Sequence, residues 1–257
     1  MTTLRQTQFM TVRHLRALAR QPWWIAVTLV QPVIWLLLFG ALFKRVVDIP
    51  GFQGGSYIEF LAPGVVIMTA FFSAGWSGMP VIEDLDRGVI DRFLVAPTRR
   101  GSLIGGRLAH GTVTIVIQSL IIVALALAVG AGFENGVVGV AGLIVVAVLL
   151  AAAFSALSIG LALLARHEET LIAAVQFVTL PLTFLSTAFM QKALMPGWMS
   201  RVADVNPVNW AIEAGRAAAL GDGDLGYVAT RAGFLAAFAV ACCLFAVRAF
   251  RAYQASV

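Results

Sequence analysis

Six long apolar segments occupy most of this 257-residue chain. A helix needs about 20 apolar residues to cross roughly 30 Å of hydrocarbon, and each segment is long enough to do so. Charged residues make up only 12% of the chain, whereas soluble domains contain about 25%. We therefore predict an all-α integral membrane protein with six transmembrane helices in a single domain, residues 1–257. The six runs are Trp24–Phe43, Phe60–Val81, Leu108–Val129, Val137–Ala165, Leu171–Met190 and Tyr227–Val247.

Residue types and spacings exclude several chemistries. The middles of the six runs contain no Asp, Glu, Lys, Arg or His, which disfavours coupling to an ion or proton gradient. The only lysines, Lys44 and Lys192, are not followed by Ser or Thr, so the chain lacks a GxxxxGK[ST] phosphate-binding loop. The histidines and cysteines have no metal-site spacing, and no catalytic constellation can be assembled. We predict no catalytic residue, no metal site and no nucleic-acid partner.

The distribution of arginine and lysine predicts the orientation of the chain. With a cytoplasmic N-terminus, 12 of these cations fall inside and 6 fall outside. Loops rich in Arg and Lys remain in the cytoplasm, so we predict cytoplasmic N- and C-termini in a plasma membrane. The excess of arginine over lysine favours a bacterial source. The six outside cations are Lys44, Arg45, Lys192, Arg201, Arg216 and Arg231.

Residues 4–22 are predicted to form an amphipathic helix on the inner membrane surface. At 100° per residue, the apolar side chains share one sector and the arginines an adjoining one. A helix of this kind lies in the interface plane rather than across the bilayer. The alternative is an ordinary basic lead-in to the first span. The arginines that would line the polar sector include Arg13, Arg16 and Arg20.

The stretch from Glu83 to Arg107 is the only long polar segment rich in both acids and arginines. Glu83 and Arg87 are spaced for an i,i+4 ion pair on a helix. Apolar residues then recur at i, i+3, i+4 and i+7, which gives one side of a short helix an apolar ridge. We interpret residues 82–100 as a loop whose short helix docks against another protein, and the alternative is a solvated loop. The ridge consists of Ile90, Phe93, Leu94 and Pro97, where the proline ends the helix.

Residues 191–226 are predicted to form a short helical hairpin that re-enters the outer leaflet. Asn206 can cap a helix whose first residue is Pro207, because proline needs no N–H partner at that position. Trp198 and Trp210 favour the membrane interface. The alternative is a plain extracellular loop.

Together, these motifs resemble the membrane subunits of type-2 ABC exporters, especially the daunorubicin-resistance permease group. The resemblance covers nearly the whole chain and is carried by EDLDRGVIDRFLVAPTRR between the second and third runs and by NPVNWAIEAGR before the sixth. It implies a separate ATP-binding subunit that holds ATP and Mg²⁺, with two such subunits paired with two permease subunits. The second permease subunit would form a homodimer or a heterodimer, and this chain itself would hold no cofactor.

The resemblance also implies that the docking helix is a coupling helix seated in a groove of the ATPase. The lead-helix residues Arg13, Arg16 and Arg20 would line the same interface. The coupling residues implied are Glu83, Arg87, Gly88, Arg92, Phe93, Leu94, Pro97 and Arg99.

A substrate path between the two permease subunits is implied as well, walled by the first, second and fifth runs. Its aromatic and amide side chains would suit a hydrophobic or amphipathic solute, such as a drug or antibiotic. Each of them fits helix packing or lipid contact equally well. The path residues implied are Gln31, Trp35, Phe39, Phe71, Phe72, Trp76, Gln176, Phe177, Thr179 and Phe184.

Several functions stay open at this level. Export of the solute is the predicted activity, and a lipid, a polysaccharide or a sodium ion are alternative substrates within the same family. A membrane scaffold or sensor that holds a soluble protein without transporting anything is a rival from a different class. An ion-coupled carrier is a third reading, which the uncharged span centres disfavour.

Overall fold

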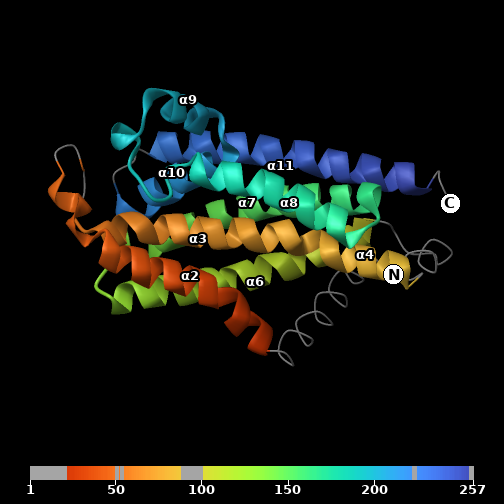
Figure 1. The fold of residues 1–257 in the computed structure, drawn as a ribbon, viewed down its shortest axis with the longest axis horizontal. Helices are drawn as coiled ribbons and strands as arrows, with labels where there is room; N and C mark the ends of the chain where they lie inside the picture. Colours follow the sequence, from red (N-terminus) through yellow and green to blue (C-terminus); the bar gives the residue numbers. More distant parts are fainter. Residues whose placement is uncertain (1–21, 50–51, 53–54, 88–100, 222–224, 255–257) are drawn as a thin grey trace.

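The computed structural model describes residues 22–49, 52, 55–87, 101–221 and 225–254, with the backbone alone described for residues 22–26, 101–110 and 225. All regular structure in this part of the chain is helical, and the long helices lie along one axis (Figure 1). The α-helices are α2 Pro22–Leu42, α3 Tyr57–Gly75, α4 Met79–Asp86, α6 Gly101–Ala128, α7 Gly136–Ala165, α8 Glu168–Phe184, α9 Gly197–Val205, α10 Pro207–Leu220 and α11 Leu225–Gln254; the 3₁₀ segments are η1 Lys44–Asp48, η2 Trp76–Gly78 and η3 Lys192–Leu194.

Helix α7 is the centre of the bundle and packs against α3, α4, α6, α8, α10 and α11. It is apolar on every side, as a helix surrounded by other helices or by lipid must be. Small residues allow its close contacts: a Cβ on Gly139 would lie 2.6 Å from the carbonyl oxygen of Ala218 in α10. A Cβ on Gly160 would lie 2.6 Å from the Phe245 ring in α11.

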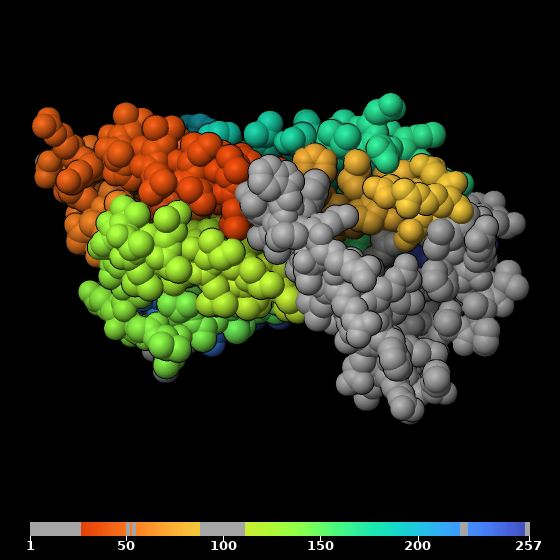
Figure 2. Space-filling view, turned by 90° about the horizontal axis from the view of Figure 1, so that it is seen from below, coloured from red at the N-terminus to blue at the C-terminus, as the bar shows by residue number. Residues whose placement is uncertain are grey.

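One buried amide ties α2 to the bundle. The Oε1 atom of Gln118 in α6 accepts from the Ser73 hydroxyl of α3 at 3.0 Å, and its Nε2 atom donates to Thr28 Oγ1 of α2 at 3.0 Å. Gln118 is 2% exposed. Its amide has lost its hydrogen bonds to water, and these two bonds compensate for the free-energy cost of burying it. Figure 2 shows α2 and α6 side by side on this face of the molecule.

Within the described residues, four helical segments are both long and apolar enough to cross a membrane. They are Tyr57–Asp86, Gly111–Ala128, Gly136–Ala165 and Gly226–Gln254. The prediction of six spans is therefore met in part. The apolar stretch of α2 is shorter, Val27–Leu42, and α8 has 17 residues.

Helix α8 ends earlier than the apolar run that predicted it, at Phe184 rather than near Met190. The reason is a side chain from elsewhere in the chain: Asn206 Nδ2 donates to the carbonyl oxygens of Leu182 and Leu185 at 2.7 and 2.9 Å. These carbonyl groups lie at the end of α8, where the last carbonyl oxygens of a helix have no backbone N–H donor within the helix. Hydropathy alone carries no sign of this termination.

Two further helix boundaries differ from the predicted runs. The second run is divided into α3 and α4 by the 3₁₀ segment η2, and the third helix begins at Gly101 rather than Leu108. The segment predicted as a hairpin contains η3, α9 and α10, so a plain loop is excluded there. Asn206 caps α10 as predicted, accepting from Val208 N at 2.9 Å.

The bundle has two ends, which can be followed in Figure 1. We call one the C-terminal end, where α4, α7 and α11 finish and α8 begins, and the other the α10 end, where α2 and α10 finish and α3, α7 and α11 begin. Residues 4–21 of the predicted lead helix, which was given as residues 4–22, and most of the predicted coupling segment lie outside the described residues. These positions are Arg13, Arg16, Arg20, Gly88, Arg92, Phe93, Leu94, Pro97 and Arg99.

Candidate functional site

Aromatic rings from α2 and α3 form a continuous row that runs toward the α10 end. Phe72 lies at its start, followed by Trp35, whose ring centroid is 5.8 Å from that of Phe72 and 6.2 Å from that of Phe39. Phe39 stacks on Phe43 at 5.5 Å. We call this set the aromatic row. Its members are Phe72, Trp35, Phe39, Phe43, Tyr57 and Phe60.

Helical spacing and one loop explain how the row is assembled. Trp35, Phe39 and Phe43 are four residues apart, so their side chains lie one above another on one side of α2. The segment after α8 adds Phe189, whose ring lies 5.3 Å from Trp35 and 5.2 Å from Phe39. The Tyr57 hydroxyl holds that segment in place by donating to the Phe189 carbonyl oxygen at 3.0 Å.

The predicted path residues divide into three groups. Trp35, Phe39 and Phe72 come together in the aromatic row, and Phe184 meets its edge through Phe189 at 6.3 Å. Buried positions form the second group: Phe71 is 1% exposed, with its ring 4.5 Å from that of Phe154 in the core, and Thr179 is 7% exposed. The third group is exposed and contains Gln31, Trp76, Gln176 and Phe177.

Four aromatic residues of this site were missed by the sequence prediction. Phe43, Tyr57 and Phe60 belong to the row, and Phe189 packs on it. Phe43 was detectable from the four-residue spacing with Trp35 and Phe39. Phe189 was not, because it contacts the row only after α8 has ended and the chain has turned.

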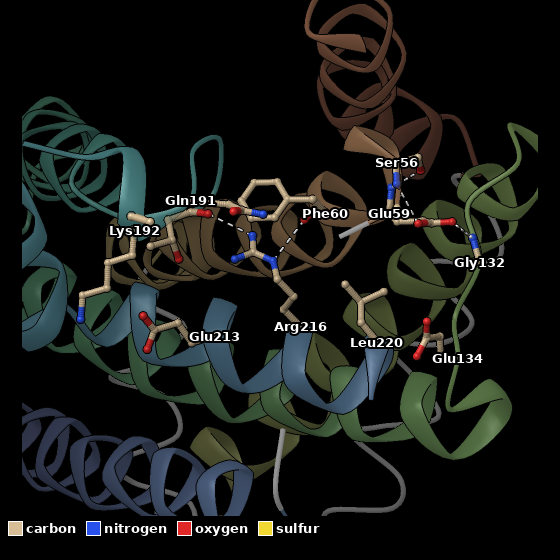
Figure 3. Close-up of a pocket in the computed structure, with 13 residues that line it drawn as sticks. Ser56, Glu59, Phe60, Gly132, Glu134, Gln191, Lys192, Glu213, Arg216 and Leu220 are labelled. Carbon is tan, nitrogen blue, oxygen red and sulfur yellow. Dashed lines mark hydrogen bonds between the residues drawn. The ribbon is translucent and has the colours of Figure 1, made fainter. Parts of the chain in front are cut away.

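A cavity of about 430 Å³ opens at the α10 end of the row. Most of its lining residues are charged or polar, in contrast to the row. They come from the start of α3, the loop between α6 and α7, the segment after α8, and α10 (Figure 3). We call it the outer cavity. Its lining residues are Gly55, Ser56, Glu59, Phe60, Gly132, Glu134, Thr187, Gln191, Lys192, Ala193, Glu213, Arg216 and Leu220.

Arg216 joins the outer cavity to the aromatic row. Its guanidinium carbon lies 3.7 Å from the centroid of the Phe60 ring, within cation–π range. Its Nε and Nη2 atoms donate to the carbonyl oxygens of Phe60 and Thr187 at 3.2 and 3.0 Å. Figure 3 shows this side chain reaching from α10 toward the ring. The row therefore ends at a fixed positive charge.

Carboxylates brace the walls of the outer cavity. Glu59 Oε2 accepts from Ser56 N at 2.9 Å while its own N–H bonds the Ser56 hydroxyl, a capping box at the start of α3. Its Oε1 atom accepts from Gly132 N at 3.1 Å, which ties the α6–α7 loop to α3 (Figure 3). Glu213 forms an ion pair with Arg231 of α11 at 2.9 Å.

A buried amide links these walls. Asn209 of α10 is 0% exposed, and its Oδ1 atom accepts from both the backbone N–H and the hydroxyl of Thr187, at 2.8 and 2.6 Å. Its Nδ2 atom donates to Glu213 Oε1 at 3.0 Å. The segment after α8 is thus fastened to α10 by side-chain bonds, in a place without helical backbone pairing.

The C-terminal end carries the described part of the predicted coupling segment. Glu83 and Arg87 form the predicted i,i+4 pair, 3.6 Å apart and with side chains 50% and 71% exposed. A pair this exposed adds little stability. Both side chains are accessible where α4 ends.

An apolar helical bundle that carries an aromatic row and a charged cavity at one end belongs to the class of multi-pass membrane proteins. The particular family follows from comparison with known proteins. The chain belongs to the ABC-2 type transporter family, whose sequence model matches residues 5–220.

Several curated relatives resemble the chain over most of its length. The transport permease ycf38 of Pyropia yezoensis is 32% identical over 77% of this chain and 68% of its own length. The daunorubicin resistance ABC transporter permease protein DrrB1 of Streptomyces coeruleorubidus is 29% identical over 81% and 74%. The inner membrane transport permease YadH of Escherichia coli K12 is 28% identical over 83% of both chains.

Membership establishes the general role of the chain. It is a multi-pass transport permease subunit and not itself a catalytic enzyme. A protein of this family works with an ATP-binding subunit. The resemblance drawn from the sequence motifs is thereby confirmed at the level of the family.

Proposed function

We propose that the chain is the permease subunit of an ATP-driven exporter that moves a hydrophobic or amphipathic solute out of the cytoplasm. Two copies of this chain, or this chain and a second permease, would pair with two ATP-binding subunits that hold ATP and Mg²⁺. The relative from Streptomyces coeruleorubidus is named for daunorubicin resistance, which makes a drug-like solute the leading candidate.

The proposed solute class is supported by one observation: the aromatic row leads directly into the outer cavity. Aromatic rings bind apolar and planar groups through area and ring geometry. The row ends at Arg216 and at a cavity lined with carboxylates. A molecule with an apolar body and a polar or charged end would meet matching chemistry along this line. A purely hydrophilic ion would not.

Coupling to the ATPase is assigned to the C-terminal end. The exposed pair Glu83 and Arg87 stands at the end of α4, directly before residues 88–100. Phe93 and Leu94 would fill a groove of the ATPase, while Arg87 and Arg92 would meet acids on it, since interface energy concentrates in a few buried anchors.

The orientation proposed from the arginines agrees with how the bundle groups them. The six cations predicted to be outside all belong to elements at the α10 end, whereas Arg87, Arg166, Arg248 and Arg251 lie at the C-terminal end. We therefore propose that the outer cavity faces away from the cytoplasm, in a plasma membrane. Relatives also occur in plastids, so the bacterial source stays a proposal.

Purification of the tagged chain in mild detergent, with mass spectrometry of its partners, tests this function. We expect recovery of an ATPase with a GxxxxGK[ST] loop, and its loss in the double variant Phe93→Ala, Leu94→Ala. The matched control is Val137→Ala, Val138→Ala, a pair of exposed apolar residues at the opposite end of the molecule.

A transport assay on the complex reconstituted in inside-out vesicles then distinguishes an exporter from a scaffold and from an ion-coupled carrier. ATP-dependent accumulation of daunorubicin would support the exporter. An ATPase that stays bound while no solute moves under any condition would favour a scaffold, and accumulation that collapses with an ion gradient while ATP is intact would favour a carrier. Absence of any ATPase from a complex that retains its permease partner would overturn the coupling assignment.

A further inference from the structure

A 3₁₀ break divides the most buried of the four long apolar segments in the described part of the chain. Segment η2, Trp76–Gly78, separates α3 from α4, although Tyr57–Asp86 is otherwise one continuous span. Trp76 has φ −83° and ψ −1°, so its ψ departs from the value of about −42° in a regular α-helix. A 3₁₀ stretch within a helix often marks a hinge or a strained sequence.

A single hydroxyl of α7 bridges this break. Ser158 Oγ donates to the carbonyl oxygen of Gly75 at 2.5 Å and accepts from the N–H of Gly78 at 3.0 Å. Ser158 is 2% exposed, so neither backbone group is near bulk water. A buried backbone group that lost this partner would pay a desolvation penalty.

The break packs closely against both α7 and α8. A Cβ on Gly78 would lie 2.6 Å from the carbonyl oxygen of Ser158, and one on Gly75 would lie 2.9 Å from Cγ1 of Val175. Glycine is required at both positions by space and not by φ. A second contact joins Ser77 and Ser155, whose hydroxyl oxygens are 2.9 Å apart.

The break also separates two hydrophobic clusters. Residues of α3 up to Ala74 belong to the large cluster with α6, α7 and α10. Beyond the break, Val81 and Ile82 of α4 belong to a different cluster at the C-terminal end, with parts of α7, α8 and α11. The two sides of the break therefore pack into different hydrophobic clusters, and α7 and α8 contribute to both.

We propose that η2 is the hinge through which movement of α4 reaches α3, and that Ser158 is the positioning residue that holds the hinge in the geometry seen here. The proposal rests on the proposed function, because the movement is supplied by the ATPase at the end of α4. Three independent features carry it: the 3₁₀ backbone, the double hydrogen bond of one hydroxyl, and the change of cluster at the break.

The first test compares Ser158→Ala with Ser155→Ala. Both remove one buried hydroxyl from the same side of α7, but only Ser158 contacts the backbone of the break. The readout is the number of daunorubicin molecules accumulated per ATP hydrolysed by purified complexes in vesicles. We expect Ser158→Ala to lower this ratio at least fivefold with the ATPase still bound, and Ser155→Ala to change it less than twofold.

A purely structural role predicts a different pattern. Loss of complex yield, or an equal fall in transport and ATP hydrolysis with an unchanged ratio, would overturn the positioning role of Ser158. An equal fall of the ratio in both variants would also overturn it, because the effect would then not depend on the bonds of Ser158 to the backbone of the break.

A reversible cross-link tests the hinge itself. In a Cys242→Ala, Cys243→Ala background, the pair Ser77→Cys and Ser155→Cys places two thiols where the hydroxyls are 2.9 Å apart, close enough for a disulfide. We expect oxidation to abolish transport while the ATPase stays bound, and reduction to restore it. The two single cysteine variants are the controls.

The outcomes separate this proposal from the proposed function. Unchanged transport by the oxidised, cross-linked protein would show a rigid break and overturn the hinge alone. Failure of the cross-link to form would contradict the approach of η2 to α7. If the unmodified complex shows no ATP-dependent transport, the proposed function fails and the hinge fails with it.

Discussion

At the scale of single residues, one amide decides how two helices meet. Asn206 caps α10 with its oxygen and closes α8 with its nitrogen, and it is 2% exposed. The capping half was predictable, since Asn before Pro is a local signal. The other half was not, because the two carbonyls of α8 lie more than twenty residues earlier in the sequence.

Asn206→Asp tests the two halves separately. The aspartate keeps the oxygen that caps α10 but cannot donate to Leu182 and Leu185, and its charge faces two carbonyl oxygens. Each unsatisfied buried group costs about 1–3 kcal/mol, so we expect the free energy of unfolding to fall by about 3 kcal/mol. Thermal unfolding of the purified protein in detergent measures this change.

Asn135→Asp is the matched control, because Asn135 donates to the Ala218 carbonyl oxygen at 2.9 Å in an exposed position. Water can replace that partner, so we expect a change below about 1 kcal/mol. Equal effects of the two substitutions would contradict the bridging role of Asn206.

At the scale of helices, close packing depends on positions that hydropathy does not distinguish. Gly139 and Gly233 both lie in apolar helices. A Cβ on Gly139 would contact backbone atoms of α10 at 2.6 and 3.1 Å, whereas one on Gly233 would meet nothing within 4 Å. The sequence gives no sign of this difference, since it depends on which helices become neighbours.

Gly139→Ala is therefore expected to destabilise the bundle. Overpacking against backbone typically costs about 1–3 kcal/mol, and here the α7–α10 contact must separate. Gly233→Ala is expected to be neutral or to stabilise by up to about 1 kcal/mol through helix propensity. Thermal unfolding of both variants in the same detergent compares them, and equal stabilities would argue against the close α7–α10 approach.

The aromatic row makes a prediction about transport at the same scale. Trp35→Ala removes the ring that contacts Phe72, Phe39 and Phe189. Loss of about 1.4 kcal/mol of binding corresponds to about tenfold weaker apparent affinity, so we expect the KM for daunorubicin to rise about tenfold. The assay is ATP-dependent accumulation in inside-out vesicles.

Leu38→Ala is the control for this experiment. Leu38 lies on the same helix and is 57% exposed, and it belongs to no ring contact of the row. A similar KM for both variants, or a fall in kcat alone for Trp35→Ala, would place the row in helix packing and not in solute binding.

At the scale of the whole molecule, composition and the lengths of the apolar runs were sufficient for the fold class, and the family was indicated by a resemblance of motifs. High apolar content and long runs predicted an all-helical membrane protein, and two polar motifs carried the family resemblance. The division of the second run at Trp76 was not predicted. It depends on Ser158, about eighty residues later, whose hydroxyl bonds the backbone on both sides of the break.

Orientation in the membrane is the last property that the arginines predict. Arg201 in α9 and Arg251 near the end of α11 are exposed and lie at opposite ends of the bundle. Positive loops stay in the cytoplasm, so a cysteine at position 201 should be outside and one at position 251 inside. A Cys242→Ala, Cys243→Ala background removes the native thiols.

Labelling of intact cells with a membrane-impermeant maleimide measures this directly. We expect the Arg201→Cys variant to be labelled in intact cells and the Arg251→Cys variant only after permeabilisation. The reverse pattern would place the outer cavity in the cytoplasm, and the aromatic row would then lead solute toward an inward opening. Labelling of both positions from one side would mean that α11 does not cross the bilayer, contrary to its length and hydropathy.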